Sequence, residues 1–311
     1  MRLPMWRTFP GFLLLPALLI LPGCGDREAP VTDLQILEVA GVGLQGPSAV
    51  VVDARSDVYL VTNQAGPRGA RDGNGFITRI SPEGEVLDLD WTGPHITDPD
   101  LALHSPSGLA IRGDSLLVAD LNCVRILHRS TAQPLARECV VTADILSDVA
   151  VGPDGSVYVI DSGLRLGDDG ELEATGTDAV YRLVLDEGGR STTLDRGDEL
   201  ANPSAVAVGT RGIFVATSGT GEIYRVLPGQ PRTTVYPPRG IHVAGIVFLP
   251  DGGFAFSSWT EGIVHRVTGE GRVERLLENV STPGGLAYDE SRNRLIVTLT
   301  EEDRVIFVEL P

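Results

Sequence analysis

One unit recurs six times along the chain and constrains the fold more than any other feature. Each unit has a start of small residues, an apolar run, a polar turn, a second apolar run and a third run rich in aromatic and β-branched residues. Val, Ile, Tyr and Thr dominate the runs, as is typical of strands. The starts lie at residues 47–49, 106–108, 146–148, 203–205, 243–245 and 283–285.

Three of the five spacings between these starts are 40 residues. A repeat of that length with four short strands is typical of a β-propeller blade, so residues 34–311 are predicted to form an all-β, six-bladed propeller. The last repeat holds only three runs, and residues 35–40 are expected to supply its missing outer strand and hide two sheet edges. An open sandwich is the competing architecture, and the regular spacing argues against it.

Residues 1–23 read as a signal peptide rather than as part of the fold. Arg2 and Arg7 precede an apolar stretch that is too short and too interrupted by proline to cross a bilayer, which takes roughly 20 helical residues. We expect export, with residues 24–33 forming a tether between the membrane and the propeller.

The signal ends in Leu21-Pro22-Gly23-Cys24, which resembles the lipobox of bacterial lipoproteins. In that family the cysteine is lipidated and becomes the first residue, which implies that Cys24 carries a membrane anchor. Gly25, rather than an aspartate, follows it. The resemblance therefore implies the outer membrane, facing the periplasm, rather than the inner one. A plain signal peptide cut nearby is the alternative.

The charge balance excludes several partner classes. The chain has 25 basic and 42 acidic residues, and every basic residue is arginine. A chain with a net charge of −17 repels nucleic acid, so no nucleic-acid partner is expected. Without lysine, Schiff-base chemistry and a P-loop are both excluded. We expect a monomer.

Long loops are predicted to gather on one face of the propeller. Because successive strands run antiparallel, the insertions at 64–74 and 163–179 fall on the same face as the connection at 91–105. Lengthened loops on a rigid scaffold commonly shape a binding site, although neutral drift in loop length is the alternative.

Two cysteines remain after Cys24. Cys123 opens the third strand of the second unit and Cys139 lies near the end of the fourth, so a hairpin about Thr131 places them opposite each other. We predict a structural disulfide, as suits an exported chain. Two buried free thiols are the alternative.

Several motifs resemble the gluconolactonase and senescence-marker (regucalcin-like) propellers, which are related to the NHL-repeat propellers. They are residues 147–155 with 157–163, residues 106–111 with 117–120, and residues 245–252. That family hydrolyses sugar lactones with one divalent cation, calcium or zinc, at the mouth of the central channel.

The family's site residues are not kept here. The resemblance places its glutamate on Ser48, its substrate asparagine on Ser147, its metal-binding asparagine on Ser204 and its aspartate on Ala244. Three hydroxyls and a methyl group suit a hard cation poorly. We therefore expect no cofactor. A divalent cation held by a neighbour such as Asp148 or Asn202 is the alternative.

Polar and aromatic residues end the second strands on the loop-rich face. The ligand-binding candidates are Asn63, Asp120, Asn122, Asp161 and Trp259. Asp120 and Asp161 lie in neighbouring units and are candidates to hold a cation or polar ligand together, whereas Trp259 suits stacking. Turn formation by the polar residues and packing by the tryptophan are the alternatives.

These features favour a lipid-anchored binding module that takes a small polar molecule, a glycan or a partner protein. The alternative is a divergent metal-dependent hydrolase that acts on a lactone or ester through Asp120, Asp148, Asp161 or Asn63. A structural part of an envelope complex is a third hypothesis. No residue is assigned a catalytic role.

Overall fold

The computed structural model describes residues 29–30, 34–39, 43–96, 98–140, 142–185 and 190–311. Cys24 and the predicted signal peptide lie outside these residues. Within them, no helix has the length and apolar character needed to cross a bilayer.

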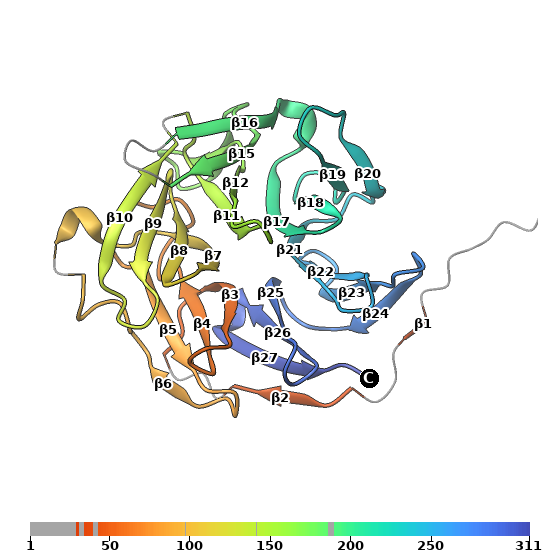
Figure 1. The fold of residues 1–311 in the computed structure, drawn as a ribbon, viewed down its shortest axis with the longest axis horizontal. Coiled ribbons are helices and arrows are strands. Elements are labelled where there is room, and N and C mark those ends of the chain that lie inside the picture. Colours follow the sequence, from red (N-terminus) through yellow and green to blue (C-terminus); the bar gives the residue numbers. More distant parts are fainter. Residues whose placement is uncertain (1–28, 31–33, 40–42, 97, 141, 186–189) are drawn as a thin grey trace, which may run out of the picture.

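Six antiparallel sheets surround a central channel, which confirms the predicted six-bladed propeller (Figure 1). Each blade runs outward from its inner strand. The first three blades are β3 (Pro47–Asp53), β4 (Val58–Asn63), β5 (Phe76–Ile80) and β6 (Val86–Asp88); β7 (Pro106–Arg112), β8 (Ser115–Asp120), β9 (Cys123–His128) and β10 (Pro134–Cys139); and β11 (Leu146–Val151), β12 (Val157–Asp161), β15 (Ala179–Val184) and β16 (Arg190–Arg196).

The last three blades repeat this order. They are β17 (Pro203–Gly209), β18 (Gly212–Thr217), β19 (Ile223–Val226) and β20 (Thr233–Tyr236); β21 (Val243–Phe248), β22 (Phe254–Ser258), β23 (Ile263–Val267) and β24 (Val273–Leu277); and β25 (Pro283–Asp289), β26 (Arg294–Leu299) and β27 (Arg304–Glu309).

The N-terminal end of the propeller closes the ring as predicted. β2 (Ile36–Glu38) pairs antiparallel with β27, with Ile36 opposite Val308 (Figure 1). The strand expected over 35–40 is thus present in a shorter form. Within the predicted tether, β1 (Ala29–Pro30) pairs parallel with β24.

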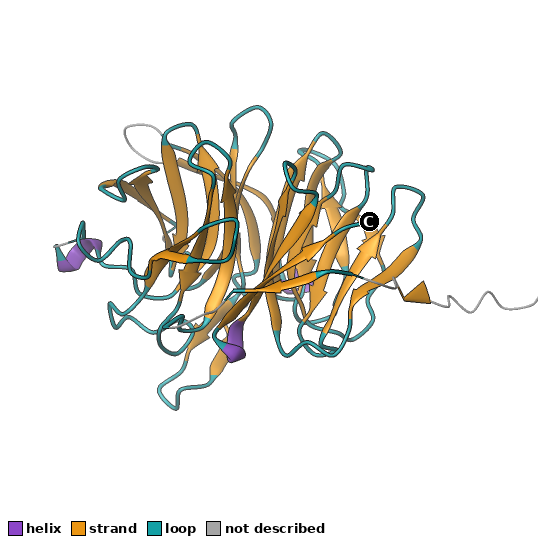
Figure 2. Ribbon diagram, turned by 90° about the horizontal axis from the view of Figure 1, so that it is seen from below, coloured by secondary structure: helices purple, strands orange, loops and turns teal. Residues whose placement is uncertain are grey.

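The hydrophobic core lies between the blades. Six clusters of buried side chains each join two neighbouring blades, and the second strand of every blade is buried along almost its whole length. Because both faces of these strands pack on other blades, their sequences are continuous apolar runs instead of alternating patterns. The side view in Figure 2 shows the strands running between two loop-bearing faces.

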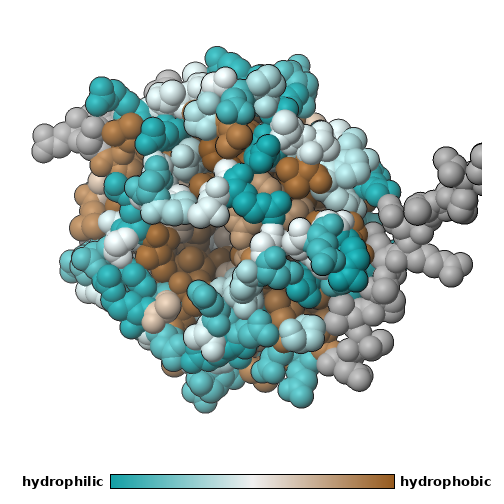
Figure 3. All heavy atoms as spheres, turned by 45° about the vertical axis from the view of Figure 1, so that its right-hand side comes forward, coloured by the Kyte–Doolittle hydropathy of each residue, from teal (hydrophilic) through white to brown (hydrophobic). Residues whose placement is uncertain are grey.

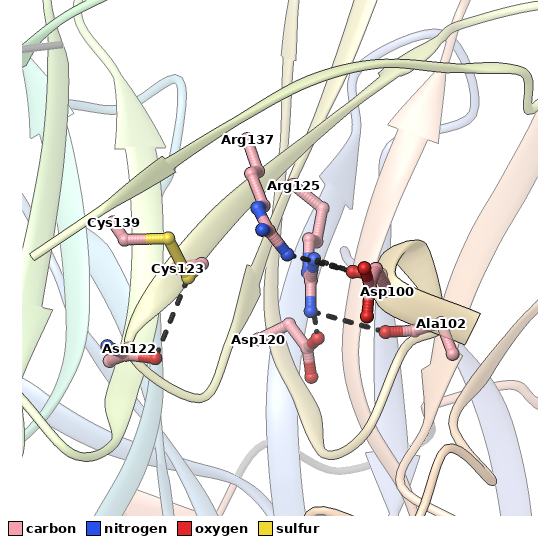
Figure 4. Close-up of a disulfide and its surroundings, with 8 residues drawn as sticks. All are labelled: Asp100, Ala102, Asp120, Asn122, Cys123, Arg125, Arg137 and Cys139. Carbon is pink, nitrogen blue, oxygen red and sulfur yellow. Dashed lines mark hydrogen bonds and ion pairs between the residues drawn. A yellow bond between two sulfur atoms is a disulfide. The ribbon is translucent and has the colours of Figure 1, made fainter. Parts of the chain in front are cut away.

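The predicted disulfide joins β9 and β10. Cys123 and Cys139 are opposite each other in the ladder, and their sulfur atoms are bonded (Figure 4). The bond therefore links the third and fourth strands of the second blade, as the symmetry of the hairpin predicted.

Candidate functional site

A cavity of about 310 Å³ lies at the mouth of the channel on the loop-rich face. The insertions that were predicted to share this face line it. Gln64 and Arg68 come from the 64–74 loop, and Leu172 comes from β14 (Leu172–Ala174), which pairs with β13 (Leu164–Leu166) inside the 163–179 loop. His242 and Trp259 complete the wall from the loops on either side of β21 and β22.

The floor of the cavity is a ring formed by the second residue of each inner strand. These residues are Ser48, Ser107, Ser147, Ser204, Ala244 and Gly284, and we call them the serine ring. All six are small. At Gly284 the space is limited by its own blade, because a Cβ atom there would lie 2.7 Å from Thr298 Oγ1 on β26.

The hydroxyls of the serine ring bind neighbouring blades together. Each of the four serines donates to the carbonyl of the first residue of the next blade, whereas Ser257 and Thr300 provide the corresponding links around the fifth and sixth blades. The pairs are Ser48 with Pro106 (2.8 Å), Ser107 with Leu146 (2.6 Å), Ser147 with Pro203 (2.7 Å), Ser204 with Val243 (2.5 Å), Ser257 with Gly284 (2.6 Å) and Thr300 with Pro47 (2.8 Å).

These contacts decide whether the family's cation fits. Ser48, Ser147 and Ser204 direct their protons at carbonyl oxygens, and Ala244 offers only a methyl group. A hard cation takes six to eight oxygen ligands. Across the described ranges, no group of three or more His, Cys, Asp or Glu side chains could hold a metal ion. The residues at the family's ligand positions therefore do not fit a divalent cation.

Arg68 brings a positive charge to the mouth of the channel. Its half-buried guanidinium forms no hydrogen bond or ion pair with any described residue, although the chain carries 42 acidic side chains. Burial lowers the pKa of Arg68, but an arginine side chain stays protonated at neutral pH. The guanidinium of Arg68 therefore offers a positive charge and N–H donors to a ligand in the cavity.

His242 and Trp259 form an aromatic platform beside it. Their rings stack with centroids 5.8 Å apart and planes 20° from parallel, and the Trp259 amide donates to the His242 carbonyl at 2.8 Å. Burial and the nearby charge of Arg68 lower the pKa of His242 to about 4. At pH 7 the imidazole is therefore neutral, and Arg68 is the charged side chain that lines this cavity.

Of the five ligand-binding candidates from sequence, Trp259 lines the cavity and the other four do not. Asn63, Asp120 and Asp161 are the last residues of second strands, and Asn122 lies in the turn after β8. Asn63 is buried and holds its turn, since its Oδ1 accepts from the Gln45 amide at 2.9 Å and its Nδ2 donates to Thr78 at 2.9 Å. Asn122 is half-buried, with its Oδ1 3.6 Å from the disulfide sulfur of Cys123 (Figure 4).

Asp120 is fully engaged within its own blade. One oxygen forms an ion pair with Arg125 Nε at 3.1 Å (Figure 4). The other accepts the amides of His104 and Ser105. Arg125 also donates to the carbonyls of Asp100 and Ala102. The aspartate therefore anchors the 91–105 connection to the end of β8.

Asp161 is buried at the end of β12. Its Oδ1 accepts the Gly163 amide at 3.0 Å, whereas its Oδ2 has no hydrogen-bond partner among the described residues. Burial raises the pKa of Asp161 to about 6. Asn202, one alternative ligand, donates its side-chain amide to the Ser162 carbonyl at 3.0 Å and caps the neighbouring turn.

Sequence reasoning missed Arg68, although it singled out the loop that carries it. His242 was visible only as a histidine before an inner strand, and nothing in the sequence pairs it with Trp259. His104, which lies two residues before the inner strand of the second blade, accepts the Gly73 amide at 3.0 Å and does not line the cavity.

No family model and no curated protein sequence matches the chain. Solved structures share its fold. A gluconolactonase from Xanthomonas campestris is 15% identical with a TM-score of 0.66, covering 91% of this chain and 92% of its own. Virginiamycin B lyase from Staphylococcus aureus is 15% identical with a TM-score of 0.61, covering 90% and 99%. An auxiliary nutrient binding protein from Bacteroides thetaiotaomicron is 12% identical with a TM-score of 0.61, covering 89% and 76%. At these identities the likeness shows a gluconolactonase-like propeller fold, which is shared by enzymes and a binding protein.

Proposed function

We propose that the protein is a binding module that takes a small, negatively charged polar molecule in the cavity at the mouth of the channel. The observation that carries this proposal is Arg68, a guanidinium with no protein partner among the described residues, facing a cavity of about 310 Å³. That volume is at the lower end of the range for small-molecule sites.

The wall of the cavity suggests how such a ligand is held. Arg68 binds a carboxylate or phosphate through two parallel hydrogen bonds. The stacked His242 and Trp259 offer a flat surface to a sugar or aromatic ring. Gln64 adds an amide that both donates and accepts hydrogen bonds.

Two observations favour binding over lactone hydrolysis. The serines at the positions that the resemblance gives to the family's ligands join blades. Ala244, where the resemblance places an aspartate, has no group that could activate water. We therefore expect ligand binding to need no metal ion. The nutrient binding protein among the fold neighbours is consistent with a binding role for this architecture.

We also propose that Cys24 tethers the propeller to the outer membrane, facing the periplasm. The lipobox-like residues 21–24 and Gly25 support this placement. Replacing Cys24 with serine is expected to move the protein from the membrane fraction to the soluble fraction. Retention of the Cys24→Ser variant in membranes would reject the lipid anchor.

Calorimetry with matched probes tests the binding proposal. Glucuronate is expected to bind and glucose to bind at least tenfold more weakly; benzoate and benzamide form a second pair. Arg68→Gln should abolish the preference for the anion, because each charge-assisted hydrogen bond contributes about 1.5–3 kcal/mol. Arg68→Lys should retain part of it.

Arg71→Gln is the matched control, since Arg71 is an exposed arginine of the same loop. It should leave affinity unchanged. Equal affinity for the charged and neutral probes, or equal loss in both arginine variants, would contradict the proposal. A ligand that binds only as an intact glycan or protein would show no saturable binding with these probes and would count against a small-molecule site.

A further inference from the structure

A second cavity occupies the channel on the other side of the serine ring. It measures about 440 Å³, and inner strands of all six blades line it with aliphatic side chains, among them Val50, Leu109, Val149, Val206, Ile246 and Leu286. We call it the lower channel. Figure 3 shows one face of the molecule with a hollow near its middle and hydrophobic residues around it.

The charges of the two cavities differ in sign. Asp148 and Glu290 are the charged side chains that line the lower channel, and both are acidic. Arg68 is the charged side chain of the upper cavity. A ligand selected by the lower channel is therefore expected to be cationic and largely hydrocarbon.

Asp148 stands where the other blades carry only small residues. It is the third residue of its inner strand, and the equivalent residues are Ala49, Gly108, Ala205, Gly245 and Gly285. The strands nearly touch here, since a Cβ atom on Gly108 would lie 2.7 Å from the Asp148 Cα. A carboxylate at this level is therefore held firmly in place.

The carboxylate retains capacity for a ligand. Oδ1 accepts the Val149 amide at 2.8 Å, and Oδ2 accepts the Val206 amide of the next blade at 2.9 Å. A carboxylate has about four acceptor positions, so two remain. No described residue forms an ion pair with Asp148.

We propose that the lower channel is a second binding site, for a primary alkyl- or arylammonium ion. Its nitrogen lies at Asp148, and its hydrocarbon part packs on the aliphatic walls. An ammonium group has three donors, which matches the free acceptor positions of the carboxylate. An unpaired carboxylate among apolar walls is costly, and a bound cation removes that cost. Consistent with this, burial raises the pKa of Asp148 to about 7.

Calorimetry of the wild-type protein with hexylammonium and hexanol at pH 8 tests the site without any variant. Hexylammonium is expected to bind at least tenfold more tightly than hexanol. Equal affinity would reject a role for the carboxylate, and no binding of either probe would reject the site.

Asp148→Asn is expected to abolish this preference, since the amide keeps the size of the side chain but removes its charge. Glu83→Gln, at an exposed residue that lines neither cavity, is the matched control and should change affinity less than threefold. If Glu290→Gln causes a larger loss than Asp148→Asn, the cation lies elsewhere and the proposal is rejected.

This site is independent of the proposed anion site. Arg68→Gln should leave hexylammonium affinity unchanged, and Asp148→Asn should leave glucuronate affinity unchanged. Failure of one site is thus distinguishable from failure of the other.

Discussion

Ser147 on β11 donates its hydroxyl proton to the carbonyl oxygen of Pro203 on β17, at an Oγ–O distance of 2.7 Å. The two residues are 56 positions apart and belong to neighbouring blades. The contact is one of a series around the channel, and the same residues form the floor of the candidate site. Ring closure and the floor of the cavity therefore depend on the same hydroxyls.

Removing one of these hydroxyls should weaken the ring. We expect Ser147→Ala to lower the free energy of unfolding by about 1–2 kcal/mol, because the buried Pro203 carbonyl loses its donor. Chemical denaturation measures the change. Ser191→Ala, at an exposed position of β16, is the control and should stay within about 0.5 kcal/mol of wild type. Equal effects of the two substitutions would show that the Ser147 hydroxyl does not stabilise the contact between the two blades.

Asp148 should make stability depend on pH. Its pKa rises from the ordinary 3.8 to about 7 in the folded protein, because burial outweighs two amide donors. The folded state thus holds the proton more tightly than the unfolded state. The stabilising effect is complete below pH 4 and is lost as the pH rises through 7, at no more than about 1.4 kcal/mol per pH unit.

Asp148→Asn removes the titrating group, so the stability of the variant relative to wild type should rise between pH 5 and pH 8. Denaturant titrations at both pH values give the difference between the two proteins, which removes the contribution of other titrating groups. A difference that does not change with pH, or one of the opposite sign, would show that the carboxyl group is not strained by burial.

Asp120 should be structural and not a ligand. Asp120→Asn leaves Arg125 buried with a weakened partner, and breaking a buried ion pair costs about 3–5 kcal/mol. We expect a marked fall in the midpoint of thermal unfolding and unchanged glucuronate affinity in the folded fraction. A stable variant that no longer binds would instead support the ligand role predicted from sequence.

The disulfide should stabilise the second blade. Reduction, or the double substitution Cys123→Ser with Cys139→Ser, is expected to cost about 3 kcal/mol, since the bond closes a loop with a sequence separation of 16. Denaturation with and without reductant measures this cost. The double variant supplies the control, because reductant should not change its stability further.

Divalent cations should not stabilise the fold. If the serine ring has replaced the family's ligands, millimolar calcium or zinc leaves the midpoint of thermal unfolding unchanged, and chelator has no effect. A rise that saturates with metal concentration would support the divergent hydrolase. Ser204→Asn with Ala244→Asp then tests whether introducing the two residues that the resemblance places there adds metal affinity.

The fold could be predicted from sequence because its information is local and repeated. Each strand is visible as an apolar run, the 40-residue period sets the blade, and the unassigned run at 35–40 matches the strand missing from the last repeat. The cysteine pair follows from the symmetry of one hairpin. All of these are relationships between residues that are near in sequence or one repeat apart.

The candidate site could be predicted only in outline. The loop-rich face and Trp259 can be identified in the sequence. The sequence does not show whether each polar side chain has a hydrogen-bond or ion-pair partner. In the sequence Asp120 is a plausible ligand-binding residue, but in the structure its carboxylate forms an ion pair with Arg125 on the neighbouring strand. Arg68 sits in a loop without periodicity, and nothing local shows that its charge has no partner.

The sequence by itself thus determined the architecture, the ring closure and the disulfide. Only the tertiary structure decided which polar groups are satisfied within the protein and which remain free to bind. The physical reason is that strand formation depends on the pattern along one segment, whereas the hydrogen bonds of a side chain at the channel depend on donors and acceptors that neighbouring blades bring to it.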